Sequence, residues 1–222
     1  MPIRSPARNS AQVPAPARCC ADGMAAPRAR STRRQQTMQQ SSPPLALLIV
    51  DMVSTFDFPR GASLRRAAHG IAPRLAALKA RVKAAGGLCV YANDNFADWS
   101  SDFQTLVQLA RQSPAREVLE PIAPDADDAH VLKPRHSAFH QTALHHLLKS
   151  RDVARVLVTG VSTESCVLAT ALDARIRELE VCVVSDCVAS SSPARRMHAL
   201  AVLRHCDIPV RAAARALHAR RA

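Results

Sequence analysis

Aromatic residues are scarce in this 222-residue chain. Phe, Tyr and Trp together make up 3% of it, so a hydrophobic core has to be built from Ala, Val and Leu. Proteins that bind single-stranded nucleic acid stack the bases on aromatic side chains, and here these are nearly absent. No apolar run approaches the roughly 20 residues that a membrane-spanning helix needs. These absences favour a water-soluble globular protein with no membrane partner.

Acidic residues are also few in the first part of the chain, and this explains half of the net charge of +12. Residues 1–44 carry seven Arg and one Asp, whereas the rest of the chain carries 23 basic and 17 acidic side chains. A small surplus spread over a domain does not form the basic stripe of a nucleic-acid-binding protein. We therefore expect a small-molecule substrate and no nucleic-acid partner.

The seven cysteines lack the spacing of a disulfide or zinc framework. Their number is odd, they contain no C-x-x-C pair, and no secretory hydrophobic segment precedes them. Cys89 and Cys182 lie inside apolar runs, where cysteine acts as a small hydrophobic residue. The pattern predicts a reducing, cytoplasmic location.

The chain divides into three parts by composition. Residues 1–43 are rich in Arg, Ala, Pro, Ser and Gln and have no hydrophobic period, which predicts a disordered basic extension. This extension is either a transit peptide or, as we favour, an upstream extension of the gene start, because Met38 lies shortly before the first apolar run. Residues 44–214 are the expected single domain, and residues 215–222 are an expected basic tail.

Apolar runs of strand length alternate with helical periodicity from Leu45 onward. The runs are continuous rather than alternating, which is typical of strands covered on both faces. Each connection is long enough for a crossover between parallel strands. The sequence thus predicts a three-layer α/β fold, with a mostly parallel, Rossmann-like sheet of about six strands and helices on both faces. The expected strands are 45–51, 88–92, 130–133, 156–159, 181–185 and 208–213.

Three residues with complementary chemistry follow expected strands, namely Asp51, Lys133 and Cys166. Ligands of such folds bind at the carboxyl ends of the strands. Cys166 falls in the first turn of a helix expected from about Thr163, where free N–H groups and the helix dipole favour a thiolate. Asp51 is the candidate base, Lys133 the candidate cation, and the N–H groups of the turn the candidate oxyanion hole. Together they predict an acyl-transfer site.

These residues lie in motifs that resemble those of the isochorismatase-like cysteine hydrolases. The resemblance extends from about Leu45 to Ala213. It implies that Asp51, Lys133 and Cys166 form the catalytic triad of a hydrolase that cleaves a C–N bond of a small amide, carbamoyl or imide substrate through a thioester. It also implies a homo-oligomer, either dimer or tetramer. The matching segments are 48–52, 133–139 with Thr142 and Leu144, 160–167, 170–174 and 183–186.

The family carries a non-proline cis peptide that maps here to Val161–Ser162. By the same resemblance, this bond would aim the Ser162 N–H at the oxyanion, beside the N–H of Cys166. The substrate pocket is assigned by position only, to residues of the loops that follow the strands. Loops of this kind set specificity, so the substrate itself is not readable from the sequence. The candidate pocket residues are Phe56, Phe58, Asn93, Trp99 and Phe139.

Two departures from the family narrow the chemistry. Nicotinamidases of the family bind a metal through an Asp-x-His pair and a further His after the second strand, where this chain has 93–96, Asn-Asp-Asn-Phe. The later group of His136, His140, His145 and His146 contains no H-E-x-x-H motif, so we expect neither a metal nor a cofactor. Isochorismatases proper cleave a vinyl ether and generally lack the cysteine. Vinyl-ether hydrolysis with Asp51 as the acid, or an inactive binding module of the same fold, are the alternatives.

Overall fold

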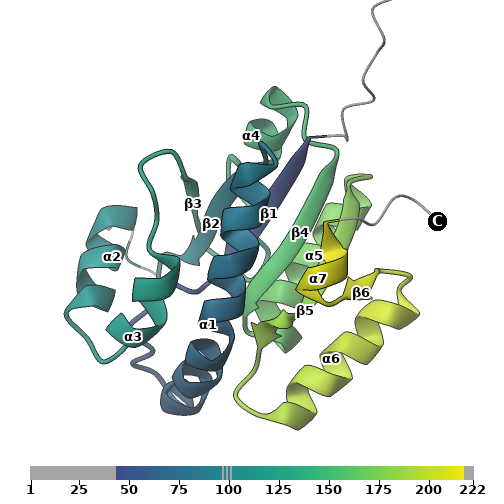
Figure 1. The fold of residues 1–222 in the computed structure, drawn as a ribbon. Coiled ribbons are helices and arrows are strands. Elements are labelled where there is room, and N and C mark those ends of the chain that lie inside the picture. Colours follow the sequence, from purple (N-terminus) through teal and green to yellow (C-terminus); the bar gives the residue numbers. More distant parts are fainter. Residues whose placement is uncertain (1–43, 97, 99, 101, 218–222) are drawn as a thin grey trace, which may run out of the picture. The chain divides into compact units, whose positions relative to one another are not determined.

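The computed structural model describes residues 44–217 except 97, 99 and 101. Within this part, six strands form one sheet in the order β3-β2-β1-β4-β5-β6, and every neighbouring pair is parallel (Figure 1). This confirms the predicted α/β fold and its number of strands. The predicted extension, residues 1–43, and residues 218–222 of the predicted tail lie outside the described part. The strands are β1 (Leu45–Val50), β2 (Leu88–Asp94), β3 (Ala129–Lys133), β4 (Arg155–Val161), β5 (Glu180–Ala189) and β6 (Val210–Arg211).

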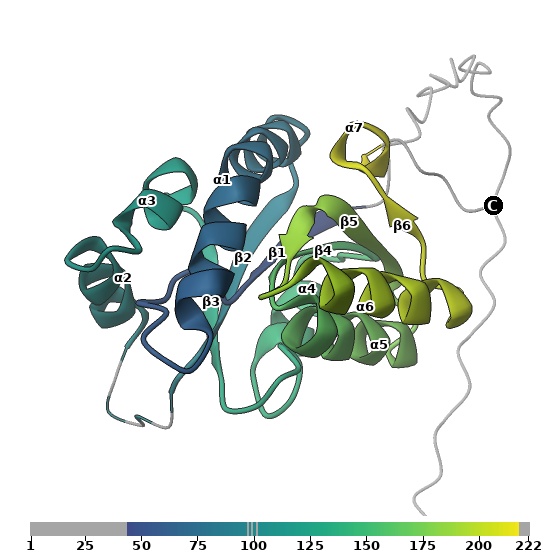
Figure 2. The same ribbon diagram turned by 90° about the horizontal axis from the view of Figure 1, so that it is seen from below.

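Helices cover both faces of the sheet, as predicted (Figure 2). One face carries α1 (Gly61–Ala84), α2 (Phe103–Arg111), α3 (Arg116–Leu119) and α7 (Ala213–Ala216), with a short 3₁₀ turn at Glu120–Ile122. The other face carries α4 (Leu144–Ser150), α5 (Leu168–Ile176) and α6 (Pro193–His205). No helix in the described residues is long and apolar enough to cross a membrane.

The continuous apolar runs are explained by burial on both faces of the sheet. In β1, Leu47 and Ile49 pack into the core under α1, whereas Leu48 and Val50 pack into the core on the side of α5 and α6. All four side chains are fully buried. Because successive side chains of a strand point to opposite faces, a strand covered on both sides must be apolar at every position.

Two helix boundaries did not follow from the pattern in the sequence. The sequence allows Pro73 either to lie within a helix that starts near Leu64 or to mark the helix start, and in the structure it lies inside α1. A helix expected from Phe139 begins only at Leu144, because the preceding residues form turns. The Thr142 hydroxyl stabilises them: it donates to the Ala138 carbonyl at 2.6 Å and accepts from the Leu144 N–H at 3.2 Å. These turns carry the segment from the end of β3 around the carboxyl edge of the sheet.

The strand order places a topological switch point between β1 and β4. From β1 the chain proceeds outward through β2 and β3, and it then returns to the other side of β1 for β4, β5 and β6. Open parallel sheets bind ligands in the crevice outside the strand ends at such a point. The segments that follow β1 and β4 therefore border the expected ligand site.

Candidate active site

Asp51 directly follows β1, the strand that lies between β2 and β4. Its backbone φ is 51°, a left-handed conformation that Asp adopts more readily than most residues. The Asp51 N–H donates to the Ala92 carbonyl at 3.0 Å, and its Oδ1 accepts from the Asp94 N–H at 2.8 Å. These two bonds to β2 hold the carboxylate in one orientation, with Oδ2 directed toward Lys133.

Lys133 is the last residue of β3, which lies two strands away from β1. Two strand spacings amount to roughly 9.5 Å, so the long lysine side chain crosses the end of β2 to reach Asp51. Its side chain is fully buried, and its Nζ lies 2.9 Å from Asp51 Oδ2 and 3.5 Å from Asp94 Oδ2. Nζ also donates to the Arg135 carbonyl at 3.3 Å. The ammonium is thus enclosed by two carboxylates.

Cys166 lies in the turn that follows β4. The peptide bond Val161–Ser162 is cis, as the family resemblance implied. The next residues, Thr163–Val167, form one π-helical turn that continues into α5. Cys166 is 9% exposed, and its Sγ lies 3.5 Å from Lys133 Nζ. The fold therefore brings together all three residues that the sequence singled out.

The backbone of this turn leaves the Cys166 amide in a distinctive position. The N–H groups of Ser165 and Val167 both donate to the Ser162 carbonyl, at 3.1 and 3.2 Å. The N–H of Cys166 lies between them and makes no bond to that carbonyl. An N–H group next to a nucleophile, at the start of a helix, is suited to donate a hydrogen bond to the negatively charged oxygen of a tetrahedral intermediate.

The charges of the site favour a neutral thiol in the resting protein. Burial, together with the negative charge of Asp51, raises the pKa of Cys166 to about 12, although the Lys133 ammonium opposes this. Burial also raises the pKa of Asp51, against the lowering effect of Lys133. For Lys133, burial lowers the pKa, but its negative neighbours, Asp51 foremost, outweigh it and the pKa is raised. The position at a helix start is therefore not sufficient to ionise this thiol, because burial opposes ionisation.

His136 lies in the site, although no catalytic role was predicted for it from the sequence. It was considered only as a metal ligand, together with three later histidines. Its Nδ1 lies 3.8 Å from Cys166 Sγ and 3.1 Å from Ser165 Oγ, and its ring is exposed. Because His136 follows Lys133 by only three residues, in the turns before α4, it lies at the same carboxyl edge of the sheet as Lys133.

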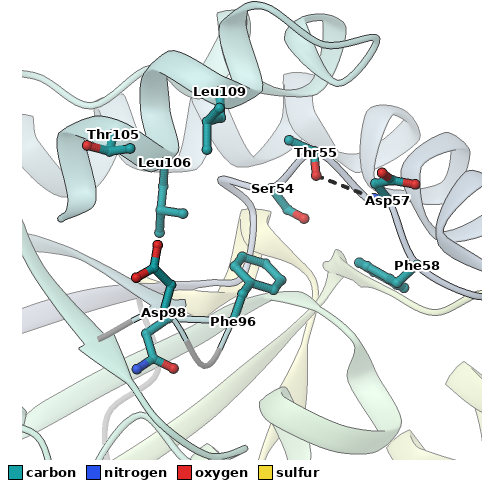
Figure 3. Close-up of a pocket in the computed structure, with 10 residues that line it drawn as sticks. Ser54, Thr55, Asp57, Phe58, Phe96, Asp98, Thr105, Leu106 and Leu109 are labelled. Atoms are coloured by element: carbon teal, nitrogen blue, oxygen red, sulfur yellow. Dashed lines mark hydrogen bonds between the residues drawn. The ribbon is translucent and has the colours of Figure 1, made fainter. Parts of the chain in front are cut away.

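A hollow of about 320 Å³ lies between the segments that follow β1 and β2 and helix α2 (Figure 3). Ser54 and Asn95, which line it, are close in the chain to Asp51 and Asp94. Two phenylalanines line it as well, Phe58 and Phe96, which are 42% and 48% exposed. The hollow combines apolar rings with hydroxyl, amide and carboxylate groups, which is typical of a small-molecule pocket.

The predicted pocket residues occupy different environments. Phe58 lines the hollow. Phe56 is buried, and its ring centroid lies 6.2 Å from that of Phe58. Asn93 is fully buried and donates to the Val53 carbonyl at 2.5 Å. Phe139 is buried on the face of the sheet that α4, α5 and α6 cover, under the Arg177 guanidinium. Trp99 lies outside the described residues, and a role in substrate binding stays a prediction for all five.

A model of one protein family, the isochorismatase domain, matches residues 45–215. The chain belongs to the isochorismatase family. The match covers all six strands of the sheet and includes Asp51, Lys133 and Cys166. Membership in this family of hydrolases agrees with the fold and with the grouping of these residues at the carboxyl edge.

Several known proteins are similar to this chain. An uncharacterized isochorismatase family protein of Bacillus subtilis, YaaI, is 35% identical over 71% of this chain and 87% of its own length. Maleamate amidohydrolase of Pseudomonas putida is 28% identical over 64% of this chain and 71% of its own. The crystal structure of a cysteine hydrolase from Pseudomonas syringae pv. phaseolicola superimposes with a TM-score of 0.59 and 28% identity, covering 78% and 91% of the two chains.

Proposed function

We propose that this protein is a cysteine hydrolase that cleaves the C–N bond of a small amide, carbamoyl or imide substrate through a thioester intermediate. One observation carries the proposal: the Lys133 ammonium lies within 3.5 Å of both the Asp51 carboxylate and the Cys166 sulfur. A nucleophile, a base and a fixed positive charge are the groups that acyl transfer through a cysteine requires. A maleamate amidohydrolase and a cysteine hydrolase among the similar proteins support it.

The reaction begins from the neutral thiol. Asp51 accepts the proton of Cys166 as Sγ attacks the carbonyl carbon of the substrate, so the thiolate forms only when an electrophile is present. The raised pKa of both groups matches this order, because burial disfavours a free anion on either one. The N–H of Cys166, assisted by that of Ser162, stabilises the oxyanion.

The intermediate then expels the amine, which takes its proton from Asp51, and an acyl thioester on Cys166 remains. Asp51 is then a carboxylate again, and it takes a proton from the water molecule that attacks this thioester. Collapse releases the carboxylic product, and the departing sulfur recovers the proton from Asp51. One water molecule is consumed, and the thiol and carboxylate end as they began.

Lys133 keeps the site charged throughout this cycle. Its raised pKa means that the ammonium remains protonated at neutral pH. It lies close enough to Asp51 and Cys166 to stabilise whichever of the two carries the negative charge. We propose that the substrate enters from the hollow beside Ser54, Phe58 and Phe96, with its carbonyl directed toward Cys166.

The proposal is tested with purified protein and a panel of small amides, carbamoyl compounds and cyclic imides, with ammonia or amine release as the readout. Cys166→Ala is expected to reduce kcat by at least about 10³-fold, because no other group forms the thioester. Cys206→Ala serves as the matched control, because this partly buried cysteine lies at the end of α6, outside the site.

Intact-protein mass spectrometry of the wild type with a slow substrate is expected to show an acyl adduct that Cys166→Ala lacks. Equal turnover by wild type and Cys166→Ala would refute thioester chemistry and favour vinyl-ether hydrolysis by Asp51. Neither turnover nor an adduct across the panel would favour an inactive binding module.

A further inference from the structure

A second hollow, of about 730 Å³, lies between α1 and the segment that joins β5 to α6. Arg66 and Arg74 line it from α1, and Ser190 and Arg196 line it from the other side. None of the three triad residues lines this hollow. It is therefore a separate feature, which the proposed reaction does not use.

The walls of this hollow carry an excess of positive charge. Within the described residues, no carboxylate forms an ion pair with the guanidinium groups of Arg66, Arg74 or Arg196. Asp186 is the acidic residue of the lining, and its Oδ1 accepts a hydrogen bond from the Ala213 N–H at 2.8 Å. Three cations therefore face one carboxylate that is already engaged by the backbone.

One of these guanidinium groups is held in place by carbonyl groups rather than by an acid. Arg196 Nε donates to the Val188 carbonyl at 3.0 Å, and one of its terminal nitrogens donates to the Ser185 carbonyl. A guanidinium has five N–H donors, so donors remain for a ligand. Its charge is fixed in position but not neutralised, which suits it to bind an anion.

Ser190 borders the hollow, but its hydroxyl is buried beneath the surface. Ser190 is only 4% exposed, and its Oγ has no hydrogen-bond partner among the described residues. A buried hydroxyl without a partner is unfavourable, and native structures contain few of them. The hydroxyl also lies close to the start of the 13-residue helix α6, whose dipole directs its positive end there.

We propose that this hollow binds a small phosphate-type oxyanion, either free phosphate or the phosphoryl group of a metabolite. The anion would accept hydrogen bonds from the three arginines, whose planar, multiple donors match its oxygens. The hollow adjoins the catalytic turn, because Ala189 pairs with Val161 in the sheet and its carbonyl accepts a bond from the Thr163 hydroxyl at 2.9 Å.

Binding is measured on the full chain by calorimetric titration with inorganic phosphate, pyrophosphate and phenyl phosphate, at constant ionic strength. Saturable binding is expected. Tighter binding of phosphate or pyrophosphate than of phenyl phosphate indicates a site for the free ion, and the reverse order indicates a site for a phosphomonoester. The double variant Arg66→Gln/Arg74→Gln is expected to raise Kd by about tenfold or more, since each lost charged hydrogen bond weakens binding substantially.

Two further variants make the result specific. Arg111→Gln/Arg204→Gln removes two exposed arginines outside the hollow, so it makes the same charge change and is expected to leave Kd within about twofold. Ser190→Ala is a second control: because the Ser190 hydroxyl is closed off from the hollow, Kd is expected to stay within about twofold of the wild type. Absence of saturable binding, or equal losses in both double variants, would overturn the proposal.

Discussion

At the scale of single residues, the pKa of the Cys166 thiol is set by opposing effects of its neighbours. Burial and the Asp51 carboxylate keep Cys166 protonated at rest, while Lys133 favours its ionisation. The net result is a thiol beside a charged pair rather than a preformed thiolate. Such a cysteine is activated by the substrate, and in the resting state it is expected to react slowly with alkylating reagents.

The pH dependence of activity reports on Asp51. Burial raises its pKa above the ordinary value of 3.8, so this carboxylate becomes protonated, and unable to accept the thiol proton, at a higher pH than a free aspartate. We expect kcat/KM to fall as the pH is lowered through that raised value. Rate profiles measured between about pH 4 and pH 8 check this, because they span the ordinary range of Asp and His.

His136→Gln is the control for this profile, since the His136 ring also lies beside the sulfur and an imidazole is a second candidate base. We expect the variant to keep the acid limb. A profile that became flat in His136→Gln would assign the base to the histidine instead.

At the scale of elements, one glycine allows β4 to lead into the catalytic turn. Gly160 has a φ of 101°, a conformation that residues with a side chain rarely adopt. A methyl group added there would overlap the carbonyl oxygen of Val50 in the neighbouring strand β1. The close approach of these two strands directly precedes both Asp51 and the cis peptide Val161–Ser162.

Gly160→Ala is therefore expected to destabilise the protein by at least about 2 kcal/mol, from the unfavourable φ together with the overlap. Urea unfolding followed by circular dichroism measures this. Gly70→Ala is the matched control: Gly70 lies in helix α1 with open space around it, and alanine there is expected to add about 0.5–1 kcal/mol of stability. Similar stabilities for the two variants would contradict the role assigned to Gly160.

At the scale of the whole molecule, burial of the Asp51 carboxylate opposes folding at neutral pH, whereas the raised pKa of Lys133 favours the charged lysine in the folded protein. Since burial raises the pKa of Asp51 in the folded protein, the folded state disfavours its charged form. Its contribution to stability is thus greatest below the unfolded pKa and is lost as the pH rises through the folded pKa. At neutral pH the Asp51 carboxylate therefore opposes folding, and its contact with the Lys133 ammonium offsets part of this cost.

Replacing one member of this pair or both gives opposite outcomes. Lys133→Met leaves the Asp51 carboxylate, whose side chain is only 15% exposed, without its cation and is expected to lower the free energy of unfolding by about 2–4 kcal/mol. Lys133→Met/Asp51→Asn removes both charges and is expected to recover most of that loss or exceed the wild type. Urea unfolding at neutral pH measures both variants. A double variant no more stable than the single one would show that the pair itself stabilises the fold.

Much of the fold was predictable from local patterns. The run Leu45–Val50 is apolar at every position because both faces of its strand are buried, and β2, β4 and β5 were found in the same way. Ser192 and Pro193 marked the start of α6, where the Ser192 hydroxyl accepts from the Arg195 N–H. Local signals were weaker at the start of α4, because the turns before Leu144 are stabilised by Thr142 rather than by a helix cap.

The sequence by itself determined which groups we propose for the chemistry. Asp51, Lys133 and Cys166 follow predicted strands, and this predicted that they gather at one edge of a parallel sheet. Only the tertiary structure decided how they meet. Lys133 reaches Asp51 across an intervening strand, and His136 lies beside the sulfur. The protonation of Cys166 was also decided there, because burial and the distance between charges set a pKa, and both arise from residues far apart in the chain.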